Sequence, residues 1–293
     1  MWWLVIVILA HLFYALVFIT DKYILSRPLP YPIVYAFYVG VLSIVVLVLI
    51  PFGFYFPSRL ELGFILLAGI AQVAGWVFFY KALNKGEVSR IVPFVGSFIA
   101  IFILILSTLF LDEHLAKQQI LAFILLVLGG LTISFKKGKI FPRAFGLAFI
   151  GALCFAVFWV ITKYIFLDAP FITGIIWLRA GVALMALCLL IPKRNRQLIF
   201  GKTEKIKTGT IKIFFSARFL GLVAGFLMYL AVFWGSVTLA HSLQGLQYIF
   251  VLILAYLLFK KFPKVREQFE KEIIVQKIIA IVLIGLGLFF LII

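Results

Sequence analysis

The sequence predicts an all-α integral membrane protein with ten transmembrane helices in two inverted five-helix repeats. The first observation is composition: 66% of the 293 residues are hydrophobic and 13% are charged. Soluble domains are roughly half apolar and a quarter charged, so lipid must cover much of this chain. The second observation is ten apolar stretches of about the 20 residues that a helix needs to cross hydrocarbon. The third is an internal repeat.

The expected spans follow one another with short gaps. They are Trp2–Thr20, Pro32–Ile50, Leu60–Tyr80, Ile91–Leu111, Gln118–Phe135, Ala144–Leu167, Phe171–Ile191, Phe214–Trp234, Leu239–Phe259 and Ile273–Ile293. Prolines punctuate the gaps, as in the stretch from Arg27 to Pro32, because proline lacks the N–H that continues a helix. Pro93 lies inside the fourth span, where a kink is expected.

The start of the first span argues against a signal peptide, and the two cysteines argue against disulfides and metal binding. The first span begins without a basic segment, so we expect no cleavable signal peptide. Cys154 and Cys188 both lie inside spans, which supports neither a disulfide framework nor a metal site.

The two halves of the chain align with each other. At a shift of 141 residues, Lys22-Tyr23-Ile24 falls on Lys163-Tyr164-Ile165 and Ile50-Pro51 falls on Ile191-Pro192. We therefore divide the chain into repeats 1–143 and 144–293. Five spans are an odd number, so the second repeat enters the membrane the other way up, as in many carriers whose site lies between the repeats. The alternative is a duplication with no role in transport.

Several short motifs then carry a family resemblance. The stretch from Phe78 to Arg90 (FFYKALNKGEVSR), the following Leu109-Phe110-Leu111-Asp112-Glu113, and Gly129-Gly130 are similar to EamA-type members of the drug/metabolite transporter superfamily. The resemblance covers the chain in span number and order. It implies transport of amino acids, nucleobases, sugars or amphipathic metabolites. Lys260-Lys261 depart from the pattern, since the family usually has an acidic residue after the ninth span.

The formal charge of +17 would suggest nucleic acid in a soluble protein, but here the basic residues lie in short loops beside spans. We expect no nucleic-acid partner. Of 27 basic residues, 23 are counted with the odd connections, including Arg218 and Lys277 just inside the spans that follow; the even connections are counted with Arg59, Lys117 and Lys163. The positive-inside rule then places the odd connections in the cytoplasm and both termini outside a plasma membrane. The family resemblance implies both termini inside; we prefer the charge count. The connection from Lys193 to Lys212 is expected on anionic headgroups.

Two ionisable groups in mid-span are candidates for the substrate site, because such groups are costly in lipid. Arg179 is either a counter-ion for a carboxylate or phosphate, or a structural arginine bonded to carbonyls. His11 either titrates during transport or, as we favour, is a neutral interhelical hydrogen-bonder.

The other candidates are uncharged. Gln72, Trp76 and Tyr80 share one face of the third span, which is either a cavity wall or a packing seam. Gln244 and Gln247 share a face of the ninth. Weaker lining candidates are Tyr14, Trp159 and Tyr229.

The residue types and motifs that the sequence lacks exclude several classes of function. The ten acidic residues all lie at span ends or in connections, which favours facilitated diffusion or exchange over ion coupling. The chain has no phosphate-binding loop, no nucleophile–base cluster and no metal motif, so we expect neither an enzyme nor a cofactor. The sequence predicts a monomeric secondary transporter for a small polar metabolite, working by alternating access, and Arg179 favours an anionic one. The alternative is a translocase (flippase) for a lipid-linked headgroup. A closed central cavity would favour the first, and a lateral opening toward lipid the second.

Overall fold

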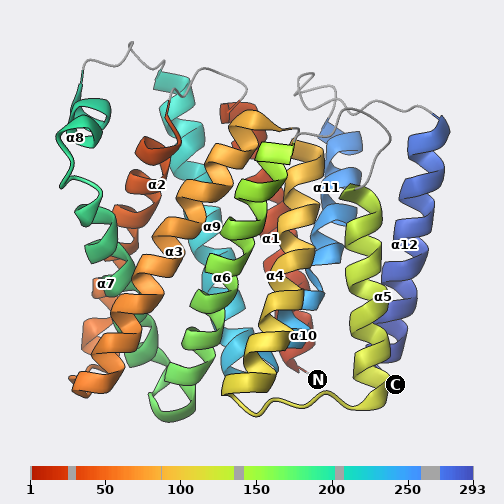
Figure 1. Ribbon diagram of the computed structural model, residues 1–293, viewed down its shortest axis with the longest axis horizontal. Coiled ribbons are helices and arrows are strands. Elements are labelled where there is room, and N and C mark those ends of the chain that lie inside the picture. The colour runs from red at the N-terminus through yellow and green to blue at the C-terminus, as the bar shows by residue number, and fades with distance from the viewer. Residues whose placement is uncertain are drawn as a thin grey trace.

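The computed structural model describes residues 2–25, 31–86, 88–134, 142–201, 208–258 and 271–292. Every regular element in these ranges is a helix. The helices are α1 (Trp2–Leu25), α2 (Pro32–Val41), the 3₁₀ helix η1 (Leu42–Phe52), α3 (Arg59–Lys85), α4 (Val88–Phe110), α5 (Lys117–Ser134), α6 (Pro142–Asp168), α7 (Phe171–Cys188), α8 (Lys193–Phe200), α9 (Thr208–Trp234), α10 (Val237–Ser242), α11 (Gln244–Leu258) and α12 (Lys271–Ile292). The long helices stand side by side in one bundle (Figure 1).

Eight of the ten expected spans are helices long and apolar enough to cross a membrane, counted over the described residues. They are α1, α2 with η1, α3, α4, α5, α6, α7 and α9. The other two expected spans fall on α11, 15 residues long, and α12, whose apolar part is Ile278–Ile292. The count of ten and the inversion of the second repeat stay predictions.

The ninth expected span differs from the sequence-based expectation of one helix over Leu239–Phe259. The chain forms α10 and α11 with a break at Leu243, whose ψ of −1° departs from the helical value of about −42°. Ser236 caps the new helix by accepting a hydrogen bond from the Leu239 N–H at 2.9 Å. His241 therefore lies in the last turn of a separate short helix, ahead of the break.

The second span changes its winding half-way. It is α-helical to Val41 and then a 3₁₀ helix for 11 residues, although such runs rarely exceed 3–4 residues. Long 3₁₀ stretches of this kind mark hinges or strained sequence. In the fourth span, by contrast, α4 continues through Pro93, so the expected kink does not end the helix.

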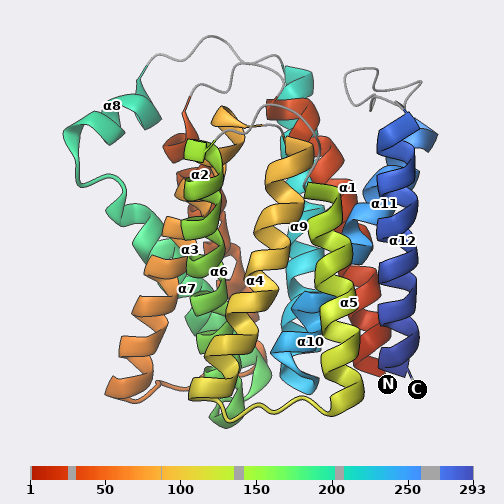
Figure 2. The same cartoon turned by 45° about the vertical axis from the view of Figure 1, so that its right-hand side comes forward.

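The two sequence halves interleave. The most extensive contacts join a helix of one half to a helix of the other: α3 packs on α6 and α7, α1 on α9 and α11, and α5 on α12. Figures 1 and 2 show these neighbours side by side. The backbones come closest where Gly69 of α3 meets Gly181 of α7: a Cβ on Gly69 would lie 2.5 Å from the Gly181 carbonyl oxygen. Small residues permit such approaches between membrane helices.

The two ends of the bundle differ in charge. The short helix α8, with exposed Lys193, Arg194 and Arg196, lies at the end away from both chain ends (Figure 1). Lys260 and Lys261 lie outside the described residues. Arg218, counted above with the seventh connection, lies within α9, where its guanidinium is 5.4 Å from the centre of the Tyr35 ring.

Candidate substrate-binding site

Arg179 lies half-buried on α7, between the winding change of the second span and α9. Its Nη1 donates a hydrogen bond of 3.4 Å to the hydroxyl of Ser43, a buried residue of η1. Its guanidinium carbon is 5.1 Å from the centre of the Tyr229 ring, within the range of a cation–π contact. In the described part of the chain, no carboxylate forms an ion pair with Arg179. In the described part of the chain, its contacts are with the Ser43 hydroxyl and the Tyr229 ring, neither of which cancels its charge.

Arg179 opens onto a groove of about 400 Å³. Three elements line it: η1 supplies Ser43 and four aliphatic residues, α7 supplies Ile175 and Arg179, and α9 supplies Tyr229 and four apolar residues. Arg179 is the one charged group among these lining residues. The groove thus combines a fixed positive charge with apolar walls, which suits a ligand with an anionic group and a hydrophobic part.

The rim of the groove is exposed on the side of the bundle. Val48 of η1 is 70% exposed and Phe226 of α9 is 40% exposed, and both line the groove. Exposed apolar side chains of spanning helices face acyl chains in a bilayer. The groove therefore has a lateral mouth with an apolar rim.

Tyr14 of α1 belongs to the same site. A Cβ on Gly225 of α9 would lie 3.0 Å from Nη2 of Arg179 and 3.6 Å from the hydroxyl oxygen of Tyr14. The absent side chain at Gly225 thus lets the guanidinium rest on the α9 backbone beside the Tyr14 hydroxyl. Of the sequence-predicted candidates, Arg179, Tyr229 and Tyr14 come together here.

A row of rings leads from this site deeper into the bundle. Trp159 of α6 lies between Tyr229, with ring centres 5.2 Å apart, and His241 of α10, at 4.7 Å. His11 of α1 follows, with its Nε2 3.3 Å from the Ala240 carbonyl oxygen. The Gln247 side chain of α11 also lies within reach of His11. Trp159, His11 and Gln247 therefore form a buried layer behind the Arg179 groove.

The remaining candidates lie elsewhere. Gln244 packs against Gly96 of α4, where an added Cβ would meet its amide carbon at 2.7 Å. Tyr80 packs edge-on against Tyr35 of α2, with ring centres 4.6 Å apart, and Trp76 belongs to the same cluster. Gln72 is buried one turn before Trp76, and its Oε1 has no hydrogen-bond partner in the described part of the chain. None of the four lines the Arg179 groove. One cavity shared by Arg179, Gln72, Trp76 and Gln244 stays a prediction.

Sequence reasoning missed Ser43 and His241. Ser43 is one small hydroxyl in an apolar run, and nothing in the sequence signals the 3₁₀ helix that presents it. His241 is the third residue of the expected ninth span, where it reads as part of the span boundary. A signal was present, because an ionisable residue near the start of a span deserves the same attention as His11.

The end of the bundle near the chain termini is held by polar contacts between the halves. Lys163 of α6 donates hydrogen bonds to the carbonyl oxygens of Val232, at 3.0 Å, and Gly235, at 2.9 Å. Ser236 donates a hydrogen bond to the Glu113 carboxylate, which lies in the connection between α4 and α5. These bonds tie the C-terminus of α9 to both halves of the chain.

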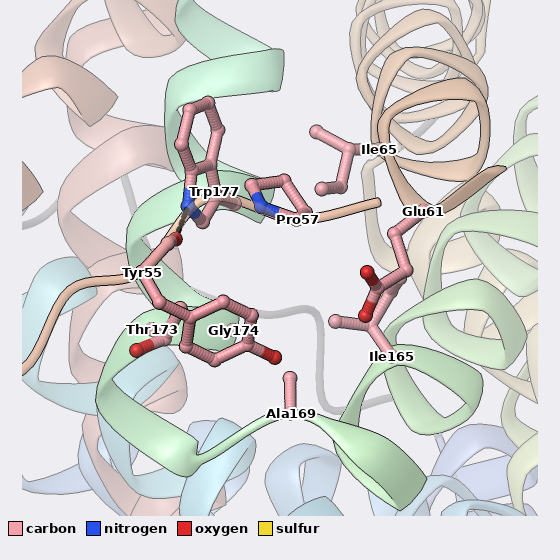
Figure 3. Close-up of a pocket in the computed structure, with 9 residues that line it drawn as sticks. All are labelled: Tyr55, Pro57, Glu61, Ile65, Ile165, Ala169, Thr173, Gly174 and Trp177. Atoms are coloured by element: carbon pink, nitrogen blue, oxygen red, sulfur yellow. Dashed lines mark hydrogen bonds between the residues drawn. The ribbon is translucent and has the colours of Figure 1, made fainter. Parts of the chain in front are cut away.

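A second, much smaller pocket lies at the same end (Figure 3). Tyr55 and Pro57, which precede α3, and Glu61 in its first turn face Trp177 and Thr173 of α7, and the Trp177 Nε1 donates a hydrogen bond to the Tyr55 carbonyl oxygen at 2.8 Å. Its volume is about 10 Å³, which is about one water molecule. This pocket is too small for a solute.

A comparison with known protein families indicates the class of protein in which this groove occurs. Residues 1–135 match the model of the EamA-like transporter family. This match covers somewhat less than half of the chain, and the resemblance predicted from the sequence is confirmed over these residues. Together with the apolar helices, the match supports a multi-pass membrane protein. The matching family is described as one of transporters.

The fold has relatives among solved structures. One crystal structure matches with a TM-score of 0.63 and 16% sequence identity, covering 96% of this chain and 96% of the other. At this identity the likeness shows the fold alone. No curated protein matches the chain.

Proposed function

We propose that this EamA-like protein is a secondary transporter for a small organic solute with a carboxylate or phosphate group. The observation that carries the proposal is the Arg179 guanidinium, which opens onto a groove of about 400 Å³ without a carboxylate partner among the described residues. A permanently charged group in a span is expensive and usually serves a substrate path. An anionic ligand would neutralise it.

The position of the groove supports a mechanism of alternating access. It lies between η1 and α7 on one side and α9 on the other. A separation of α7 from α9 would open the site and would part the ring of Phe171 from those of Phe226 and Phe233. The 3₁₀ winding of η1 provides a place where the second span can change its shape.

The test is a thermal-shift screen in lipid nanodiscs with a panel of organic carboxylates, phosphate esters and inorganic phosphate. A ligand of the folded state raises the apparent unfolding temperature by mass action. We expect at least one anion to stabilise the native protein. Arg179→Lys should weaken this binding despite keeping the charge, because an ammonium lacks the planar bidentate fork. Arg179→Gln should weaken it further.

Two results would overturn the proposal. Either no anion stabilises the native protein, or an anion stabilises Arg179→Gln as strongly as the native protein. Arg196→Gln on α8 is the matched control, since it removes an exposed arginine far from the groove.

A translocase for a lipid-linked headgroup is the second candidate, and the lateral mouth between Val48 and Phe226 favours it. Arg179 would hold the phosphate while the chain stays in lipid. Alkyl phosphates distinguish the candidates: a translocase should prefer dodecyl phosphate to propyl phosphate in the same screen, and a carrier of soluble metabolites should not.

The orientation and membrane of the protein remain part of the proposal. The basic helix α8 lies at the end away from the chain termini, which supports a plasma-membrane protein with both termini outside (Figure 1). Its three basic residues would each gain about 1 kcal/mol on anionic headgroups. We propose that the protein acts as a monomer, since the groove is complete within one chain.

A further inference from the structure

The side chains of the 3₁₀ helix η1 lie in straight rows. A 3₁₀ helix turns about 120° per residue, so every third residue points the same way. One row is buried or partly buried and consists of Ser43, Val46 and Leu49. A second row is exposed, lines no part of the groove, and consists of Ile44, Leu47 and Ile50. Burial along η1 therefore follows the period of three that this winding imposes.

The wall that η1 gives to the groove depends on the same winding. The residues of η1 that line the groove belong to the inward row and the row beside it, and they are Ser43, Val45, Val46, Val48 and Leu49. In an α-helix, which turns about 100° per residue, these positions would spread over more than half of the circumference. One groove could not contact all of them, so the wall exists in this form only with 3₁₀ winding.

An α-helical form of the segment would exchange two neighbouring residues. Relative to Ser43, Leu49 would turn away by about 120°, and Ile50 would come to within about 20° of the inward side. The segment Leu42–Ile50 would also shorten by about 4–5 Å, since the rise per residue falls from about 2.0 Å to about 1.5 Å. Gly53 directly follows η1 with a φ of +151°, a conformation that glycine adopts readily, so the chain can change direction there.

The bond between Ser43 and Arg179 supports the 3₁₀ form. Ser43 is the single polar side chain of η1, and it accepts a hydrogen bond of 3.4 Å from the Arg179 Nη1. Because 3₁₀ hydrogen bonds have poorer geometry than α-helical ones, a run of 11 residues needs tertiary support. In the α-helical form Ser43 and Leu49 no longer share a side, so the packing of Leu49 cannot fix the Ser43 hydroxyl at Arg179.

We propose that η1 is a switch between a 3₁₀ form and an α-helical form, and that an anion at Arg179 shifts it toward the α-helical form. The anion competes with the Ser43 hydroxyl for Nη1 in the 3₁₀ form alone, and a ligand shifts an equilibrium through such a difference in affinity. The wall then presents Ile50 in place of Leu49, so the shape of the groove changes with occupancy. The action of the anion rests on the proposed function, whereas the two forms of η1 do not.

The test is a scan with a nitroxide spin label, placed at one residue at a time from Ile44 to Ile50. The protein is in lipid nanodiscs and lacks Cys154 and Cys188. The rate of collision with dissolved oxygen reports how far each label faces the hydrocarbon. In the ligand-free protein we expect the label at Ile50 to collide more often than the label at Leu49. Maxima about every 3.6 residues in this state would overturn the assignment of a 3₁₀ form.

Two variants break the Ser43–Arg179 bond from opposite sides. Ser43→Ala removes the acceptor and Arg179→Met removes the donor, so in each the label at Leu49 should collide more often than the label at Ile50. Ser43→Thr keeps a hydroxyl and is the matched control, which should retain the native order. If either variant that removes the bond folds and keeps the native order, the switch is overturned. A defect in the folding of one variant leaves the other as the test.

The action of an anion is measured on the same labelled protein with propyl phosphate. We expect propyl phosphate to produce the same exchange of order between the labels at Leu49 and Ile50. If propyl phosphate raises the unfolding temperature and the native order persists, the coupling is overturned. If both variants exchange the order but no anion of the screen stabilises the protein, the transport proposal fails and the switch in η1 stands.

Discussion

The Arg179 guanidinium carbon lies 5.1 Å from the centre of the Tyr229 ring, and this contact adds to the ring contacts of Phe171 with Phe226 and Phe233 between the same two helices. This contact joins α7 to α9 through a cation and a π-face, which tolerates sliding better than interdigitated side chains do. Both side chains also line the groove. Movement of α9 relative to α7 would therefore change the site and the shape of its mouth together.

Gly225→Ala should weaken anion binding without unfolding the protein. The added Cβ would lie 3.0 Å from the Arg179 Nη2, so the end of a flexible side chain must move. The measurement is the ligand-induced thermal shift. Gly221→Ala, one turn away on α9, is the control, because its Cβ meets only the Val17 side chain at 3.8 Å. Equal ligand shifts in both variants would contradict the placement of the guanidinium on Gly225.

Gly69→Ala should lower the stability of the fold by about 1–3 kcal/mol, the usual cost of overpacking. Its Cβ would lie 2.5 Å from the Gly181 carbonyl oxygen and 2.7 Å from the carbonyl carbon, and backbone yields less readily than a side chain. The unfolding temperature in detergent measures the effect. Gly63→Ala lies on the same helix with nothing within 4 Å of its Cβ, so it should be neutral or slightly stabilising. A neutral Gly69→Ala would disprove the close approach of α3 and α7.

Lys163→Met should destabilise the C-terminal end of α9. The ammonium bonds two carbonyls there, and the negative end of the helix dipole favours a cation. Methionine keeps most of the apolar stem but leaves both carbonyls unbonded, so we expect a loss of about 1–3 kcal/mol. Hydrogen exchange of the amides near Val232 and Gly235 should rise. Lys117→Met removes an exposed charge and should change neither quantity; a similar loss there would assign the effect to charge alone.

Gln197→Cys on α8 should resist an impermeant thiol reagent in intact cells, and Phe56→Cys should react. Residue 197 is exposed beside the basic residues of α8, and Phe56 is 79% exposed in an even connection at the other end of the bundle. Both are made in a background without Cys154 and Cys188. The reverse pattern of labelling would put both termini in the cytoplasm, as the family resemblance implies.

Much of the fold was predictable because hydrophobic length is a direct consequence of bilayer thickness. The helix α7 begins at the expected residue and ends three residues early, and α9 ends at the expected residue but begins six residues early. Pro170 and Pro192 explain where α7 and α8 begin. The 3₁₀ helix and the break at Leu243 were not predictable, because both depend on tertiary contacts rather than on local composition.

In the candidate site, the sequence clearly indicated only the residues whose side chains are costly to bury in lipid. Arg179 and His11 stood out because charge and polarity are rare in hydrocarbon. Tyr14 and Tyr229 were weak candidates in a chain with 17% aromatic residues, and their importance came from their distances to Arg179. Gln72 and Gln244 looked equivalent to them in sequence, and the structure places both against other helices.

The packing of α3 against α6 and α7 has a consequence for how the chain is made. When the ribosome has completed α5, the surface of α3 that will meet Gly181 and Phe155 still lacks both partners. The first five helices must therefore wait in the membrane, with Gln72 and the glycine face of α3 covered by lipid or by the insertion machinery. Synthesis of the second half supplies the packing partners that the first half lacks. A ribosome stalled after α5 would therefore leave an incompletely packed insertion intermediate, which quality-control proteases can degrade.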